Sequence, residues 1–511
     1  MTPGGPVERF DRWFCHRVRQ TPHAPALTFE EVTYSYAQLW GASSRMAGAL
    51  AELGATKGSR VAWLGHNSPA VFIGIIAASR LGAAFVPLNR RLATAELARN
   101  LSLSGTSVLM ADTDHHPVGD QLREACPGLR TVATGEAATD WPSWIDHSPV
   151  PADTAADASA DEPLIVLFTS GTEGNPKGVV LTHSNIWWQG VAGVLSRAIA
   201  STEVVMVMSP LFHVAGLTSM MPSVWQAGGH LVLVRGFEPD LVLDAVSRYG
   251  VAFTSGVTTL FEILADHPRF DDADLSSLHS VAVGGAPLTD RLLARFAQHS
   301  VSLFQQYGMT EIAVIYSNHG DPDANPLAVG RPYFTNEVCL VTDDGSHTYQ
   351  PGDAGQVAVR GPAVFWGYLV DGVPCPRPVD AEGYFLTRDL GRLDEQGNLH
   401  LVSRLGEMIK TGGEKVYPAE VEKVLVKHPD VAEVVVVPVP HEKWGQMVVA
   451  IVVPRPGTAP ALAELRRFAE PSLARFKLPT GLRLVPAIPR TASGKLSRRA
   501  ALEEIERAMP S

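Results

Sequence analysis

A stretch of hydroxyl and glycine residues between two apolar segments is the part of the chain best suited to bind an anion. Leu164–Phe168 is apolar, Thr169-Ser170-Gly171-Thr172-Glu173-Gly174-Asn175-Pro176-Lys177 follows it, and a second apolar run begins at Val179. This pattern predicts a strand, a turn and a second strand. Glycines let backbone amides turn toward an anion, hydroxyls add donors, and Lys177 adds a positive charge. The sequence therefore predicts a phosphate-binding loop.

The alternatives for this loop are a Walker A loop and a plain surface turn. A Walker A loop is excluded because Lys177 is followed by Gly178 rather than Ser or Thr, and because the glycine spacing differs. A surface turn explains the glycines and the hydroxyls. It does not explain a lysine that closes a loop directly after a buried strand, so we prefer the phosphate-binding interpretation.

Three further segments place glycines or polar side chains at the ends of predicted strands. A strand from Val204 leads to His213, and Ser280–Leu288 brings glycines to a strand end, where the backbone can approach a flat ligand. Phe304–Glu311 ends a strand with an aromatic ring, a hydroxyl and a carboxylate. Ligands of open α/β sheets bind at the carboxyl ends of the strands, so we expect these loops to form one site.

The elements that position these loops alternate between helix and strand in the first 150 residues. Such alternation predicts an α/β domain with parallel strands covered by helices. The expected elements are a helix over Ser35–Leu53, a strand over Arg60–Leu64, a buried helix over Ala70–Leu81 and a strand over Ala84–Val86.

The last hundred residues follow a different pattern, that of a small α+β domain. We expect a helix over Pro418–Lys427, strands over Val431–Val437 and Val448–Val453, and a helix from about Ala461.

Composition limits the classes of function. The 511 residues are too many for one hydrophobic core, and the net charge of −11 argues against nucleic acid or an anionic membrane as the main partner. The four cysteines are scattered without a CxxC pair, so neither a disulfide framework nor a zinc site is indicated. The apolar region Val71–Leu88 is interrupted by Arg80 and Gly82, which favours a core helix and strand over a membrane span. We expect a soluble, cytoplasmic protein without integral membrane association.

The loop at Thr169–Lys177 resembles, almost residue for residue, the phosphate-loop signature of the adenylate-forming superfamily. That superfamily comprises acyl- and aryl-CoA synthetases, adenylation domains of peptide synthetases and firefly-type luciferases. The resemblance spans essentially the whole chain, because further signatures occur in the family's order at Tyr307–Glu311, Gly383–Gly391, Ser403–Glu422 and Pro489–Lys495. It implies the α/β adenylate-forming enzyme fold: a large N-terminal ATP- and acid-binding domain of sheets packed with helices (1–402), a hinge (403–406) and a small mobile α+β C-terminal domain (407–511).

The resemblance also implies roles for individual residues. The catalytic residues would be Lys495, Thr310, Glu311 and His213, with Glu311 also the ligand of Mg²⁺. The phosphates of ATP would be bound by Thr169, Ser170, Gly171, Thr172, Gly174 and Lys177. Adenine and ribose would be bound by Gly285, Ala286, Pro287, Gln306, Tyr307, Gly308, Asp389 and Arg404. The acyl pocket would contain His213, Val214, Val257, Gly284, Met309 and Ile312. CoA would contact Gly412, Gly413, Trp444 and Phe476, and the hinge would turn at Gly406.

The activity implied is that of an acyl-CoA ligase, which uses ATP, Mg²⁺ and CoA to convert a carboxylic acid through acyl-AMP to a thioester. The segment Pro210-Leu-Phe-His213 resembles that of acyl and aryl synthetases and not that of peptide-synthetase domains. It therefore favours an acid without an α-amine. The pocket residues are apolar, which indicates a hydrophobic or aromatic acid. A homodimer is compatible with the sequence.

Four positions depart from the family's pattern: Glu173 in the phosphate loop, Arg388 in place of a glycine before Asp389, Ser403, and Gly406 at the hinge. They leave three alternatives open. The protein would be a ligase that acts only on a preformed acyl-adenylate, an enzyme that loads a carrier-protein thiol, or a non-catalytic acyl-adenylate binder. The presence of Lys495, Lys177 and Glu311 favours the complete ligase.

Overall fold

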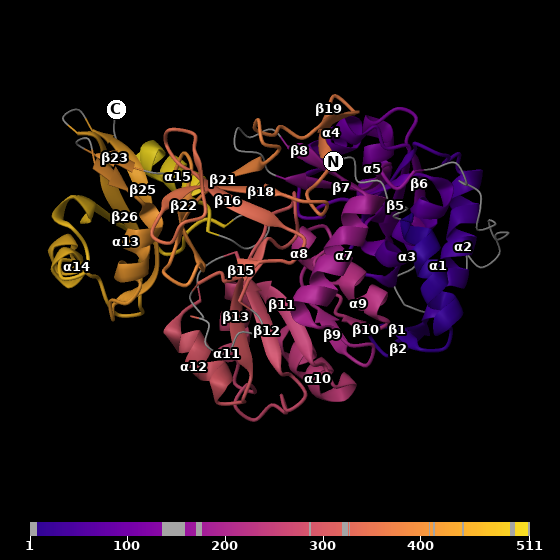
Figure 1. The fold of residues 1–511 in the computed structure, drawn as a ribbon, viewed down its shortest axis with the longest axis horizontal. Coiled ribbons are helices and arrows are strands. Elements are labelled where there is room, and N and C mark those ends of the chain that lie inside the picture. The colour runs from indigo at the N-terminus through magenta and orange to yellow at the C-terminus, as the bar shows by residue number, and fades with distance from the viewer. Residues whose placement is uncertain are drawn as a thin grey trace. The chain divides into compact units, whose positions relative to one another are not determined.

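The computed structural model describes residues 8–134, 159–169, 176–285, 288–318, 325, 328–407, 409–411, 414–441, 444–490 and 496–508. The chain divides into two compact units (Figure 1). Unit 1 comprises Met1–Glu337 and Val359–Phe385, and unit 2 comprises Val338–Ala358 and Leu386–Ser511. The predicted hinge at 403–406 lies within unit 2 in this division, and its place as the domain boundary stays a prediction.

The first sheet of unit 1 carries the predicted phosphate loop. Its strand order is β20-β19-β8-β7-β4-β3-β5-β6. The strands β3 to β6 are parallel, and β7 runs parallel to β4, whereas β8, β19 and β20 are added antiparallel. The bounds are β3 Arg60–Leu64, β4 Ala84–Pro87, β5 Val108–Asp112, β6 Arg130–Thr134, β7 Pro163–Thr169, β8 Lys177–Thr182, β19 Gly367–Val370 and β20 Val373–Pro376.

The second sheet of unit 1 carries the other predicted ligand-binding loops. Its order is β15-β14-β13-β12-β11-β9-β10-β1-β2, and the strands from β13 to β1 are parallel. The bounds are β1 Pro25–Phe29, β2 Val32–Ser35, β9 Val204–Val207, β10 His230–Leu233, β11 Phe253–Val257, β12 Ser280–Gly284, β13 Ser302–Tyr307, β14 Tyr316–Ser317 and β15 Arg331–Pro332.

Local sequence signals set the ends of the helices in unit 1. Ser35 and Gln38 form a capping box at the start of α2, and α3 begins at Pro69 and ends at the left-handed Gly82. The ring centroid of Trp187 in α7 lies 6.1 Å from that of Trp13 in α1, so the half-buried Trp187 packs against α1. The bounds are α1 Phe10–Gln20, α2 Tyr36–Glu52, α3 Pro69–Leu81, α4 Thr94–Ser104, α5 His116–Ala125, α7 His183–Arg197, α8 Val214–Leu217, α9 Met221–Ala227, α10 Pro239–Tyr249, α11 Thr258–Ala265 and α12 Asp290–Ala297, with a 3-10 turn η1 at Thr113–His115.

Unit 2 contains two sheets and its own hydrophobic clusters. One sheet has the order β17-β16-β18-β21-β22, and the other has β24-β23-β26-β25 with β27 beside β26. Valines on opposite faces of β25 pack into two clusters, one with α13 and α14 and one with α15. The bounds are β16 Glu337–Val341, β17 His347–Thr348, β18 Ala354–Arg360, β21 Phe385–Leu393, β22 Leu399–Arg404, β23 Ile409–Thr411, β24 Glu414–Val416, α13 Pro418–Leu425, β25 Val431–His441, β26 Gly445–Pro454, α14 Leu462–Ala469, η2 Arg475–Lys477, β27 Gly481–Leu484 and α15 Arg498–Ala508.

The predicted α/β architecture is confirmed, with differences only at element ends. The helix expected to reach Lys427 ends at Leu425. The region Val71–Leu88 is a buried helix followed by β4, as predicted. In the part of the chain that the structure describes, no helix has the length and apolar character needed to cross a membrane.

Candidate active site

The predicted phosphate loop joins two antiparallel strands. β7 and β8 pair in a register that sets Thr169 opposite Lys177, so these two residues stand at the base of the loop. The apolar part of β7 is buried, whereas Lys177 is exposed. The two strands predicted from sequence on either side of the loop are therefore present. Ser170, Gly171, Thr172 and Gly174 lie outside the described residues, as does Glu173.

The other predicted loops of unit 1 meet at one edge of the second sheet. β9, β11, β12 and β13 are parallel neighbours, so their carboxyl ends lie together. Val257 at the end of β11 pairs with Gly284 at the end of β12. Gly285 follows with a φ of 85°, a left-handed conformation that glycine adopts without strain. Ala286 and Pro287 lie outside the described residues.

A tight turn follows β13 and carries the largest group of predicted site residues. The amide of Ile315 donates to the carbonyl of Tyr307 at 2.8 Å, which closes the turn. A Cβ at Gly308 would lie 1.7 Å from the carbonyl oxygen of Ala313, so the turn requires glycine there. Glu311 and Ile312 are buried within the turn, while Thr310 is half-buried. The remaining predicted residues of this segment are Gln306 and Met309, both half-buried, and Tyr307, which is buried.

Tyr368 links the turn to the phosphate loop. Its hydroxyl donates a hydrogen bond to Oε1 of Glu311 at 2.8 Å, and Nζ of Lys177 lies 5.7 Å from the centroid of its ring. Tyr368 reaches this place because β19 pairs with β8 and sets Tyr368 opposite Val179, two residues from Lys177. Lys177, which is predicted to bind phosphate, and Glu311, which is predicted to bind Mg²⁺, therefore lie beside the same side chain.

Sequence reasoning missed Tyr368. The residue lies far along the chain from both of its partners, and its position follows from the antiparallel pairing of β19 with β8. The short apolar strand at Gly367–Val370 was the available signal, but it does not identify the partner strand.

His213 stands at the start of the short helix α8. It is the N-terminal capping residue, and its ring centroid lies 4.7 Å from that of Phe212. His213 and Val214 are half-buried, and α8 contacts β11, the strand that ends at Val257. These predicted acyl-pocket residues are thus close in the fold as well as in the prediction.

The predicted ribose-binding residues occupy paired positions in unit 2. Asp389 in β21 faces Arg404 in β22, and Nε of Arg404 lies 3.5 Å from Oδ1 of Asp389. The neighbouring Arg388 has a φ of 67°, a left-handed conformation that side chains other than glycine rarely adopt. This explains why a glycine would be favoured at that position, and it shows that Arg388 is accommodated with backbone strain.

The predicted hinge and CoA residues are described in part. Gly406 has a φ of 97°, so a side chain there would be strained. Trp444 and Phe476 are exposed, and Nζ of Lys477 pairs with Oε2 of Glu420 at 2.5 Å, next to the Phe476 ring. Gly412 and Gly413 lie outside the described residues.

The loop that contains Lys495 is fixed at its base, although Lys495 itself lies outside the described residues. Arg490 and Leu496 form an antiparallel bridge, and the amide of Ser497 donates to the carbonyl of Pro489 at 2.8 Å. Arg498 then forms ion pairs at 2.6 Å with Glu407 and with Glu422. Burial raises the pKa of Glu422, and the positive charge of Arg498 partly offsets this rise. The end of the loop is thereby tied to α13 and to the turn after Gly406.

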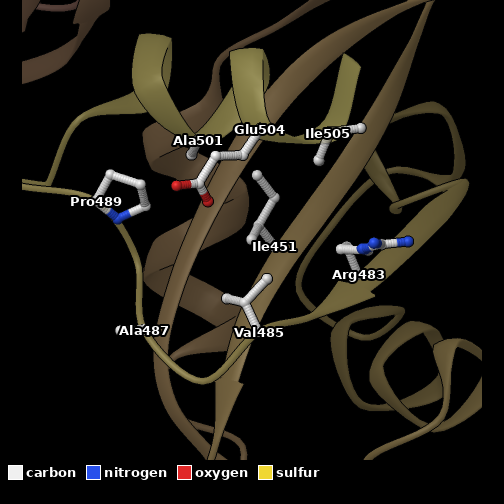
Figure 2. Close-up of a pocket in the computed structure, with 8 residues that line it drawn as sticks. All are labelled: Ile451, Arg483, Val485, Ala487, Pro489, Ala501, Glu504 and Ile505. Atoms are coloured by element: carbon white, nitrogen blue, oxygen red, sulfur yellow. The ribbon is translucent and has the colours of Figure 1, made fainter. Parts of the chain in front are cut away.

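A cavity of about 110 Å³ in unit 2 is separate from the predicted site residues (Figure 2). It is bounded by β26, β27, the segment before Arg490 and α15. Aliphatic side chains and two charged ones line it, and Figure 2 shows the Glu504 carboxylate on the side of Pro489 and the Arg483 side chain on the opposite side. No predicted site residue lines it, so we assign it no role in the reaction.

Two family models match the chain. Residues 14–369 match the model described as AMP-binding enzyme, and residues 420–495 match the AMP-binding enzyme C-terminal domain. The chain therefore belongs to the AMP-binding enzyme family, as a member of its ATP-dependent acid–thiol ligases.

Named relatives are similar over almost their full length. A feruloyl-CoA synthase from Amycolatopsis sp is 36% identical over 95% of this chain and 96% of its own. An indoleacetate–CoA ligase from Aromatoleum aromaticum is 34% identical over the same shares. Among solved structures, o-succinylbenzoate CoA synthetase from Bacillus subtilis in complex with its acyl-adenylate intermediate matches with a TM-score of 0.84 and 29% identity, over 96% of this chain and 98% of that one.

Proposed function

We propose that the protein converts a hydrophobic or aromatic carboxylic acid to its CoA thioester in two steps at one site. The observation that carries this proposal is the contact of Lys177 and Glu311 with the same side chain, Tyr368. It brings a cation of the phosphate loop and a buried carboxylate to one place at the strand ends. An ATP-dependent reaction needs both, one to bind phosphate and one to bind the accompanying metal ion.

The first step activates the acid. A carboxylate is a poor acyl donor because its leaving group would be oxide. An oxygen of the carboxylate attacks the α-phosphorus of ATP. The bond between this phosphorus and the oxygen that bridges it to the β-phosphate breaks, and acyl-AMP and pyrophosphate form. Such a step needs stabilisation of the charge on the transferred group rather than a protein nucleophile. Lys177, Thr169 and Thr310 would bind the phosphates, and Lys495 would approach from unit 2.

Mg²⁺ fits the residues at Glu311. The carboxylate is an oxygen ligand of the kind that Mg²⁺ prefers, and the hydrogen bond from Tyr368 holds one of its oxygens in place. When bound, the ion would neutralise negative charge on the triphosphate. Glu311 would hold the ion, and Tyr368 would fix the orientation of Glu311.

The second step transfers the acyl group. The thiol of CoA attacks the acyl carbon, AMP leaves, and the thiol proton goes to solvent. Unit 2 would turn at Gly406 so that the Lys495 loop leaves the site and Gly412 and Gly413 enter it. Asp389 would bind the ribose hydroxyls, and Trp444 and Phe476 would contact CoA. We also expect a cytoplasmic location for this chemistry.

Mass-spectrometric detection of acyl-CoA tests the proposal. The purified protein is incubated with Mg-ATP, CoA and a panel of carboxylic acids, and in parallel with CoA and preformed acyl-adenylates. We expect acyl-CoA from both sets. Product from adenylates alone would replace the proposal with a thioester-forming enzyme. The absence of product from both, with product on a carrier-protein thiol, would make the acceptor a protein.

A further inference from the structure

A small recess lies beside the predicted acyl pocket in unit 1. It measures about 10 Å³, which is room for one water-sized group. Ile312 and Val314 form apolar walls, and Gln189, Thr218 and Tyr333 supply polar atoms. Ile312 belongs to both the recess and the predicted acyl pocket. Thr218 directly follows α8, which begins after His213, so this helix leads from the pocket to the recess.

Three buried polar atoms in the recess have no hydrogen-bond partner among the described residues. They are Oε1 of Gln189, Oγ1 of Thr218 and the hydroxyl of Tyr333, on residues that are 8%, 1% and 5% exposed. A buried polar atom that stays unpaired destabilises the folded protein, and native proteins contain few of them. Three such atoms, on residues that line a space for one group, favour a polar group as the occupant of the recess.

The chemistry of the three atoms defines the group they would bind. Nε2 of Gln189 donates to the carbonyl of Ala363 at 3.3 Å, which identifies Oε1 as the acceptor atom of this side chain that has no partner. Burial raises the pKa of Tyr333, with Arg197 opposing, so the phenol stays protonated and able to donate. A group that donates to Gln189 and accepts from Tyr333 or Thr218 satisfies the recess. A hydroxyl does both, a carboxylate cannot donate, and a methyl group can do neither.

We propose that the substrate is a carboxylic acid that carries a hydroxyl group away from its carboxylate, and that Gln189, Thr218 and Tyr333 select that hydroxyl. This inference rests on the proposed function, since it concerns the acid of the same reaction. A site built to hydrogen-bond a substrate hydroxyl rejects the analogue that lacks it, because its own buried polar groups are then left unpaired.

Matched acids measure this selection. Phenylacetic, phenylpropenoic and phenylbutanoic acids are each supplied unsubstituted, with a ring hydroxyl and with a ring methoxy group, and kcat/KM for acyl-CoA formation is determined. For the scaffold of best fit, we expect the hydroxylated acid to exceed both analogues at least tenfold. Tyr333→Phe and the isosteric Thr218→Val should reduce the ratio of kcat/KM for the hydroxylated acid to kcat/KM for the unsubstituted acid severalfold. The reduction should come from a lower kcat/KM for the hydroxylated acid, with that for the unsubstituted acid unchanged. Tyr249→Phe, which removes a surface hydroxyl of the same unit, is the matched control and should keep the ratio.

The possible results separate this inference from the proposed function. If no acid gives acyl-CoA, the proposed function fails. If the acids are used but the hydroxyl gives no advantage on any scaffold, the selection is overturned and the three atoms serve a structural water. An equal loss of kcat/KM for all acids in Tyr333→Phe and Thr218→Val would also overturn the selection, because an equal loss would show that the two residues have a structural role.

Discussion

At the scale of single residues, the site depends on side chains whose positions come from distant parts of the chain. Glu311 is buried in the turn after β13, and its carboxylate accepts from Tyr368 of β19. The same tyrosine ring lies under Lys177. In the proposed reaction, Tyr368 would be a positioning residue, because it contacts the predicted metal ligand and the predicted phosphate-binding lysine and has no reacting atom of its own.

Tyr368→Phe should slow the first half-reaction selectively. The substitution keeps the ring beside Lys177 and removes the hydrogen bond to Glu311, so acyl-AMP formation should fall about tenfold, as expected for the loss of one hydrogen bond to a charged group. Thioester formation from preformed acyl-adenylate should change little. Tyr349→Phe, on an exposed tyrosine of unit 2, is the control. An equal loss in both half-reactions would contradict a role through Glu311.

His183 makes the stability of unit 1 depend on pH. Its ring is buried at the start of α7, where Nδ1 accepts from the amide of Phe10 at 3.1 Å, and burial lowers the pKa of His183 to about 4 from the usual 6.5. Between about pH 4 and pH 6.5, His183 therefore binds a proton in the unfolded chain and not in the folded chain. Stability is complete above pH 6.5 and falls as the pH drops, by about 2 kcal/mol between pH 6.5 and 5.

Urea denaturation at pH 7 and pH 5 measures the contribution of His183 to the pH dependence of the free energy of unfolding. His183→Gln keeps an acceptor for Phe10 and cannot take up a proton, so it should lose less stability than the wild type over this interval, by about 2 kcal/mol. Parallel losses in both proteins would exclude His183 as the source.

At the scale of elements, strand ends and turns place the site, and one strand shows the strain that a departure from the family's pattern causes. Arg388 lies in β21 with a φ of 67°, and its carbonyl accepts from the amide of Leu405 at 2.6 Å. The backbone is thus held in the left-handed region by its neighbours. A residue with a Cβ costs about 1–2 kcal/mol there, and glycine does not.

Arg388→Gly should therefore raise the free energy of unfolding of unit 2, by up to about 1 kcal/mol after the entropy cost of glycine. Arg392→Gly in the same strand is the matched control, because Arg392 is exposed and has no left-handed backbone. It should lower stability by about 1 kcal/mol. Urea denaturation measures the free energy of unfolding of both variants. Hydrogen exchange of peptides from β21 and β22 shows whether the change lies in these strands. Equal destabilisation by the two substitutions would contradict the assignment of strain to Arg388.

Local patterns predicted the elements well, and long-range pairing explains what they did not predict. The run Leu164–Phe168, the loop and Val179–Leu181 define β7 and β8 by apolar content and turn residues alone. The meeting of the carboxyl ends of β11, β12 and β13 at one edge was also predictable, because these strands are parallel neighbours in the sheet. Tyr368 and Tyr333 were not predicted as site residues, because their roles depend on strand pairing and packing across more than a hundred residues, for which a single sequence carries no register signal.

At the scale of the whole molecule, the two units have separate cores, and the proposed reaction needs groups from both. Unit 2 fixes the base of the Lys495 loop by the Arg490–Leu496 bridge and by the ion pairs of Arg498. Unit 1 carries Lys177, Glu311 and the predicted acyl pocket. In the proposed reaction, the lysine loop would act in the first half-reaction and would leave the site for the second.

The most direct test of this account compares the two half-reactions in Lys495→Ala and in the wild type. Acyl-AMP formation is measured from free acid and Mg-ATP, and acyl-CoA formation is measured from preformed acyl-adenylate and CoA. Lys423→Ala, on an exposed lysine of α13, is the control. We predict that Lys495→Ala reduces the first reaction at least a hundredfold and leaves the second within a few fold of the wild type. Wild-type protein that makes no acyl-AMP from any acid, or a Lys495→Ala variant that makes it at the wild-type rate, would contradict the account.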